Sequence, residues 1–131
     1  MFRNLMRTAS VAAILLGLAT PLAAQELRDP FEWIDRMNRS SAVMLLEEGV
    51  ITVDQAAIIA DAIEAMYAES DSPDFRRSGS YLSIEPRLLE LGGPEVSRLH
   101  TGRSSIDTGR TNLRLQQRDL ILATYEDMIE A

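Results

Sequence analysis

The densest group of side chains that could do chemistry lies between residues 98 and 114. It gathers a His and several Arg, Ser and Thr side chains with an Asp around Gly102, directly ahead of a long helical pattern. The start of a helix offers backbone N–H groups and the positive end of the helix dipole. Hydroxyl and guanidinium groups at such a place suit the binding of a carboxylate or a phosphate. We therefore expect an anion site in this segment.

The composition excludes several function classes. The chain of 131 residues carries 13 basic and 20 acidic residues, a net charge of −7 at pH 7. A surface this acidic argues against general binding to nucleic acid or to anionic membranes. One His and no Cys argue against a dedicated zinc site, and we expect neither a metal nor a cofactor. Because every basic residue is Arg, Schiff-base and ammonium-assisted chemistry cannot come from this chain alone.

Residues 1–24 have the layout of a secretory signal peptide. Arg3 and Arg7 precede an apolar run at 11–18, and small residues lead to Gln25. The apolar run is too short to span a bilayer. We expect export, most simply to the periplasm, with cleavage near Ala24; the alternatives are an uncleaved anchor or a buried helix. The mature chain would carry 11 basic against 20 acidic residues, a net charge of −9.

The remainder of the chain predicts an all-α fold. A first helix is expected over 30–48, ended by Gly49, and a second from the capping box Thr52–Gln55 to about residue 68. A polar loop at 69–80 precedes a short helix near 82–91, which either begins close to Pro86 or is kinked there. The segment 92–94, Gly-Gly-Pro, stops that helix.

The last predicted helix begins between 104 and 108 and is still running at Ala131. Its apolar face is not fully matched by the helices before it, as expected of a bundle helix whose partners lie elsewhere. That face comprises Ile106, Leu113, Leu120, Ile121, Thr124 or Tyr125, and Met128.

Three segments resemble argininosuccinate lyases of the fumarase/aspartase superfamily. Residues 40–51 resemble the early helix and Gly turn of that family, and 84–92 resemble its Ile-Glu-x-Arg-Leu segment. Residues 99–104 match its Leu-His-Thr-Gly-Arg-Ser letter for letter, and Asp107 continues the match. The resemblance covers only the first part of a family enzyme. After the signal-peptide layout at 1–24, the resemblance implies an N-terminal helical lyase-type domain at 25–103 and the truncated first helix of a central bundle at 104–131.

The resemblance implies reversible β-elimination of an N-substituted aspartate to fumarate and an amine. In this family a Ser on a mobile loop, near a Lys-Lys-Asn-Pro segment, is the base, and a homotetramer assembles the site from three subunits. Neither segment occurs here, so we expect no catalytic residue in this chain and no activity from it alone. The implied ligand contacts are Ser104, Arg103, Ser105 and Thr101. The surrounding motif comprises His100, Gly102, Asp107 and Thr111.

The sequence also departs from the family pattern. Ile106 replaces an Asn that helps to hold substrate, and Gly79 and Tyr81 stand where family members often have Asp and His. The spacing from Ser104 to Thr111 is closer to that of adenylosuccinate lyases and cycloisomerases. The family's usual role is arginine biosynthesis. Export argues against that role and favours amino-dicarboxylates taken from outside the cell.

Simpler roles remain open for each residue of the motif. The two Ser could be N-caps, Arg103 could form an ion pair, Asp107 could stabilise the helix dipole, and His100 could be structural. The alternative function is an exported, non-catalytic helical module derived from the lyase domain. A membrane-surface role is disfavoured because the helices lack a basic polar face.

Overall fold

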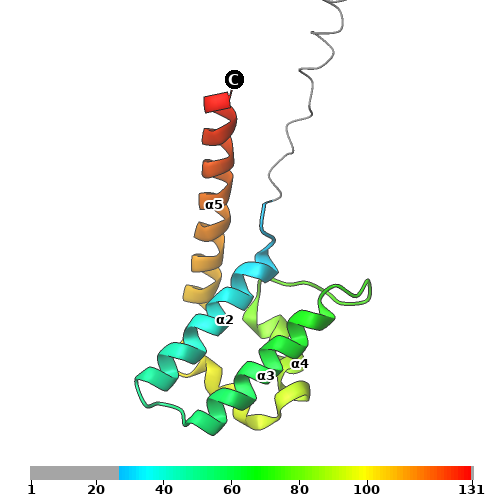
Figure 1. Ribbon diagram of the computed structural model, residues 1–131, viewed down its shortest axis with the longest axis vertical. Helices are drawn as coiled ribbons and strands as arrows, with labels where there is room; N and C mark the ends of the chain where they lie inside the picture. The colour runs from blue at the N-terminus through cyan, green and yellow to red at the C-terminus, as the bar shows by residue number, and fades with distance from the viewer. Residues whose placement is uncertain (1–26, 131) are drawn as a thin grey trace, which may run out of the picture.

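The computed structural model describes residues 27–130, so the predicted signal peptide lies outside the described residues. The described part is all-α, as the sequence predicts, and contains no strand. Its elements, shown in Figure 1, are α2 (Pro30–Glu47), α3 (Val53–Glu69), α4 (Tyr81–Gly92), the 3₁₀ helix η1 (Pro94–His100) and α5 (Ser105–Glu130). Among these helices none is long and apolar enough to cross a bilayer.

Local capping signals fix where α2 and α3 begin and end. Asp29 caps α2 by accepting a hydrogen bond from the backbone of Glu32 at 2.9 Å. Gly49, with φ of +67°, turns the chain after α2 in a conformation that favours glycine. Thr52 and Gln55 form the predicted capping box of α3, with reciprocal bonds of 3.2 and 2.9 Å.

The predicted short helix near 82–91 is α4, and one helix was not predicted. Pro86 lies inside α4, which begins at Tyr81, so the alternative of a start close to the proline is excluded. The segment before the anion-site motif forms η1, a 3₁₀ helix that the apolar periodicity did not predict. This short helix turns two buried side chains, Val96 and Leu99, into the core.

The hydrophobic core lies among α2, α3, α4 and η1. Gly92 is part of this packing, because a Cβ there would overlap Val96 and come within 2.9 Å of Ala62. Each large aliphatic side chain buried in this way stabilises the fold by about 1.5–3 kcal/mol. The core residues are Phe31, Ile34, Leu45, Ile51, Ile59, Ala62, Ile63, Met66, Tyr81, Ile84, Leu88, Val96 and Leu99.

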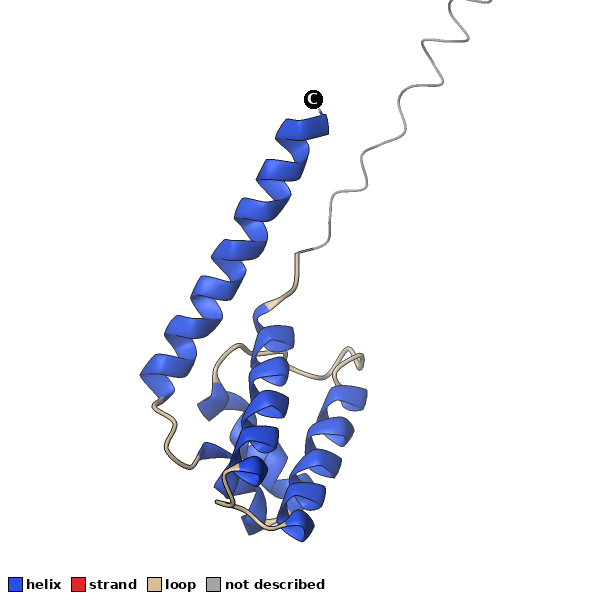
Figure 2. Ribbon diagram, turned by 60° about the vertical axis from the view of Figure 1, so that its left-hand side comes forward, coloured by secondary structure: helices blue, strands red, loops and turns tan. Residues whose placement is uncertain are grey.

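The long helix α5 stands apart from this group. Figures 1 and 2 both show its C-terminal part extending well beyond the other helices. The residues that α5 buries are polar: Thr108, Asn112 and Asp119. Seven of its large apolar residues are more than half exposed: Ile106, Leu113, Leu120, Ile121, Tyr125, Met128 and Ile129. The expectation that upstream helices leave this face uncovered is therefore confirmed, because α5 packs through its polar face.

Candidate functional site

A hollow of about 420 Å³ lies between α2 and the segment that leads into α5. Five predicted site residues line it: Gly102, Arg103, Ser104, Asp107 and Thr111. The rest of the lining is Arg36, Met37, Ser40 and Ser41 from α2, and Thr108 from α5. The other three predicted residues, His100, Thr101 and Ser105, are not part of the lining. The structure thus gathers most of the motif at one place and adds a wall from α2.

Ser104 lies where it can both cap α5 and face the hollow. Its carbonyl oxygen accepts bonds from the backbone N–H and the hydroxyl of Thr108, at 3.0 and 2.9 Å. Its own hydroxyl accepts the backbone N–H of Asp107 only at 3.4 Å, a long and weak contact. The exposed Ser104 hydroxyl therefore keeps hydrogen-bonding capacity for a ligand.

Arg103 is held from two sides. Its Nη1 donates to Oδ1 of the fully buried Asn38 at 3.0 Å, and its guanidinium carbon lies 5.3 Å from the ring centroid of Tyr81. Burial lowers the pKa of Arg103 below its ordinary value, although a guanidinium remains charged. Within residues 27–130 Arg103 forms no ion pair, so its charge is not neutralised by a neighbouring carboxylate.

His100 packs against Tyr81 rather than facing the hollow. The two rings are parallel, at 3°, with centroids 4.0 Å apart. Tyr81 is buried, and burial, followed by the nearby Glu85 carboxylate, raises the pKa of its hydroxyl. The Tyr81 ring therefore contacts both His100 and Arg103, which gives the departure from the family's His at this position a packing explanation.

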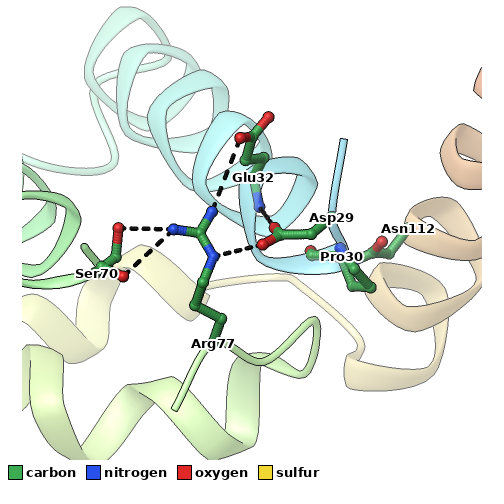
Figure 3. Close-up of polar contacts among 6 residues, drawn as sticks. All are labelled: Asp29, Pro30, Glu32, Ser70, Arg77 and Asn112. Atoms are coloured by element: carbon green, nitrogen blue, oxygen red, sulfur yellow. Dashed lines mark hydrogen bonds and ion pairs between the residues drawn. The ribbon is translucent and has the colours of Figure 1, made fainter. Parts of the chain in front are cut away.

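The Gly79 departure also has a packing explanation. A Cβ at Gly79 would overlap Cβ of Pro30 and lie 2.9 Å from Nδ2 of Asn112. That Asn112 nitrogen donates to the carbonyl oxygens of Pro30 at 2.8 Å and of Gly79 at 3.0 Å. Asn112 thus joins α5 to the start of α2, where Figure 3 shows it beside Pro30, and to the loop before α4.

A second polar cluster fixes the start of α2, the helix that forms one wall of the hollow. Figure 3 shows Arg77 bonded to Asp29 and Glu32 on one side and to Ser70 on the other. Burial alone would raise the pKa of Asp29, but the Arg77 guanidinium and the Glu32 backbone N–H bring it below its ordinary value. The guanidinium carbon of Arg77 also lies 4.8 Å from the Phe31 ring centroid.

Three residues important to this geometry are not among the predicted site residues, although one of them lies within the segment 98–114: Arg36, Asn38 and Asn112. Arg36 lines the hollow from α2, lies 5.4 Å over the Trp33 ring, and forms no ion pair in the described part of the chain. The polar residues 108, 112 and 119, spaced by four and seven, could have indicated the inner face of α5. Nothing local in the sequence marks Arg36 or Asn38.

The electrostatics of the hollow favour an anion. Its lining holds two guanidinium groups, Arg36 and Arg103, and one carboxylate, Asp107. Hydroxyl groups from both walls add neutral hydrogen-bond donors. Among residues 27–130 no cluster of His, Asp and Glu side chains is suited to hold a metal ion.

Comparison with known proteins gives a partial match. The chain is similar to the argininosuccinate lyase of Maridesulfovibrio salexigens, with 35% identity over 82 residues, 60% of this chain and 18% of that enzyme. It is similarly close to the argininosuccinate lyase of Hydrogenobaculum sp., with 36% identity over 86 residues, 63% of this chain and 19% of that enzyme. The chain therefore spans about a fifth of the length of these curated relatives. No model of a protein family matches the chain, and no solved structure matches it significantly.

These matches establish a lyase-like relationship for the matched region. The fold of the described residues, all-α with a helical core and one long separate helix, is consistent with the N-terminal domain of such an enzyme.

Proposed function

We propose that this chain forms the N-terminal part of a carbon–nitrogen lyase of the argininosuccinate lyase type. The reaction is reversible β-elimination of an N-substituted aspartate, which gives fumarate and an amine. One observation carries the proposal: residues 102–104 of the lyase-like motif line a hollow with two guanidinium groups that have no ion-pair partner among the described residues.

In this proposal the hollow holds a carboxylate of the substrate. Removal of the Cβ proton places a second negative charge on that carboxylate, which preorganised donors stabilise. The Ser104 hydroxyl and the first N–H groups of α5 supply hydrogen bonds. Arg103, fixed by Asn38 and Tyr81, supplies positive charge without having to reorganise.

The base is proposed to come from another segment or subunit. A base must reach the Cβ proton within hydrogen-bond distance, and in the family that the chain resembles the base is a Ser on a loop that does not occur in this sequence. The chain alone is therefore proposed to be inactive. A homotetramer would complete the site and would cover the exposed apolar residues of α5.

Export to the periplasm is also part of the proposal, because residues 1–24 have the layout of a signal peptide. An exported lyase would act on small amino-dicarboxylates from outside the cell rather than in arginine biosynthesis. Mass spectrometry of the exported protein should find an N-terminus at Gln25. A protein that retains residues 1–24 in the cytoplasm would contradict this part of the proposal.

A chimera tests the function directly. The matched segment of the Maridesulfovibrio salexigens enzyme is replaced by that of this chain, and fumarate release is measured by ultraviolet absorbance from argininosuccinate and other N-substituted aspartates. We expect release from at least one substrate. Ser104→Ala in the chimera should slow fumarate release about 100-fold, the usual effect of removing one hydrogen-bond donor to the charge that develops in the transition state. A folded tetrameric chimera that is inactive on every substrate would instead favour the non-catalytic helical module.

A further inference from the structure

The outer side of α5 carries a regular stripe of exposed residues. Its members recur alternately every four and three residues, the spacing of a helix that pairs with a second helix along its length. The opposite side of α5, where Asn112 and Asp119 are buried, rests on the other helices. Seven exposed residues form this α5 stripe: Ile106, Arg110, Leu113, Gln117, Leu120, Thr124 and Asp127.

The two charged members of the α5 stripe lie near its opposite ends. Neither Arg110 nor Asp127 forms an ion pair within residues 27–130. Asp127 lies in the last turn of α5, which contains no basic residue. Since the helix dipole is itself negative at that end, a carboxylate there destabilises an isolated helix. The stability of α5 alone therefore does not explain this order of charges.

A second copy of α5 that lies antiparallel to the first would match both charges. Reversing the order of the six residues from 110 to 127 places Arg110 opposite Asp127 of the second copy, and Leu113 opposite its Thr124. Two-fold symmetry repeats each of these contacts. A parallel copy would instead bring each charge beside its like. Figures 1 and 2 show the C-terminal part of α5 extending beyond the other helices, so this part of the stripe is open to a second copy.

We propose that the α5 stripe is an interface for a second copy of this chain, which binds antiparallel, with Arg110 of each copy paired to Asp127 of the other. The inference rests on the assembly in the proposed function, since it assigns the surface and the orientation through which two copies meet. Burial of Leu113 and Leu120 supplies the attraction. The ion pairs chiefly select the orientation, because exposed pairs contribute little affinity whereas like charges disfavour the parallel arrangement.

Charge exchange tests the interface by sedimentation equilibrium of the purified chain. Arg110→Asp or Asp127→Arg alone should weaken association about tenfold, because like charges then meet twice in each dimer. Both changes together should restore association, because the ion pairs form again with reversed polarity. Arg118→Asp is the matched control, at an exposed arginine of α5 outside the stripe, and should associate as the wild type does. Asp127→Arg should not weaken the helix itself, since a cation suits its last turn.

Disulfide trapping tests the orientation independently. The chain contains no cysteine, so only introduced thiols can form cross-links. Leu113→Cys and Thr124→Cys proteins are mixed and oxidised, and the cross-linked peptides are identified by mass spectrometry. Antiparallel pairing predicts cross-links mainly between the two different variants. Parallel pairing would give cross-links mainly between identical positions.

The outcomes separate this inference from the proposed function. A predominance of cross-links between identical positions, or a combined exchange that fails to restore association, would overturn the antiparallel interface while leaving the proposed assembly in place. A chain that stays monomeric and forms no cross-link would overturn both, and would mean that another segment or another protein covers the stripe. Anion binding in the hollow is measured separately by titration with succinate, so neither result counts against the lyase site.

Discussion

The guanidinium of Arg103 donates to the side-chain oxygen of Asn38 at 3.0 Å, from the motif loop to the middle of α2. This contact joins the two walls of the hollow, because Arg103 lines one wall and Asn38 belongs to the helix that forms the other. Asn38 is fully buried and neutral. The contact therefore fixes the guanidinium without cancelling its charge, which a carboxylate in the same place would do.

Asn38→Asp should weaken anion binding in the hollow. The new carboxylate would pair with Arg103 and neutralise the positive charge offered to a ligand. Asn38→Ala should leave that charge but lose the hydrogen bond, at a cost of about 1–3 kcal/mol in the free energy of unfolding. Succinate titration and denaturant unfolding separate the two effects. Equal succinate affinity in Asn38→Asp and the wild type would contradict this role.

Gly79→Ala should destabilise the chain by about 1–3 kcal/mol, because the added methyl overlaps Pro30 and displaces the Asn112 amide. Gly109→Ala is the matched control, since nothing lies within 4 Å of a Cβ there and the residue lies in α5. That control should be neutral or stabilising by up to about 1 kcal/mol. Urea unfolding measures both, and a neutral Gly79→Ala would show that the loop does not need its glycine.

The Asp29–Arg77 pair should make stability depend on acid pH. The pKa of Asp29 is lowered below 3.8 in the folded chain, so the folded chain binds this proton less readily than the unfolded chain. The contribution of the Asp29–Arg77 pair to the free energy of unfolding is therefore fully present above about pH 3.8. It is lost as pH falls through the lower pKa that Asp29 has in the folded chain.

Asp29→Asn tests that dependence, because Asn still caps the helix but carries no charge. Between neutral pH and a pH below the folded-state pKa of Asp29, the free energy of unfolding should fall less in the variant than in the wild type. Glu126→Gln, at an exposed carboxylate of α5 without an ion pair in the described residues, is the control and should follow the wild type. Parallel curves for Asp29→Asn and the wild type would exclude the pair as the source.

The apolar residues of α5 should drive association. Leu113→Gln combined with Leu120→Gln should lower the sedimentation-derived mass of the chain. The unfolding free energy of the monomer should change by less than about 0.5 kcal/mol, because both side chains are exposed. Leu82→Gln, at an exposed leucine of α4, should leave association unchanged. A chain that is monomeric at high concentration, with or without the changes, would contradict the proposed assembly.

Local signals in the sequence predicted most of the fold. The Thr52–Gln55 capping box and Gly49 set helix ends through bonds within a few residues, so they are readable without tertiary information. The packing of α5 cannot be predicted from such local signals, because it depends on contacts between residues far apart in the sequence. Its inner face is polar because Asn112 finds backbone carbonyls contributed by Pro30 and Gly79, far away in the sequence.

Only the part of the candidate site that is contiguous in the sequence was predicted. Gly102, Arg103 and Ser104 form a contiguous motif, and the structure places all three at the hollow. Arg36 comes from a helix that is distant in sequence, and only packing of α2 against the motif segment brings it there. His100, predicted as part of the surrounding motif rather than as a ligand contact, stacks on Tyr81 and is not part of the lining.

Titration of the isotopically labelled chain with succinate, followed by NMR, tests the central claim most directly. We predict saturable shifts confined to residues 36–41 and 102–111, the two walls of the hollow. Ser104→Ala combined with Arg103→Gln should abolish them. Absence of saturable shifts, or shifts centred on another surface in both the wild type and the double variant, would contradict the account.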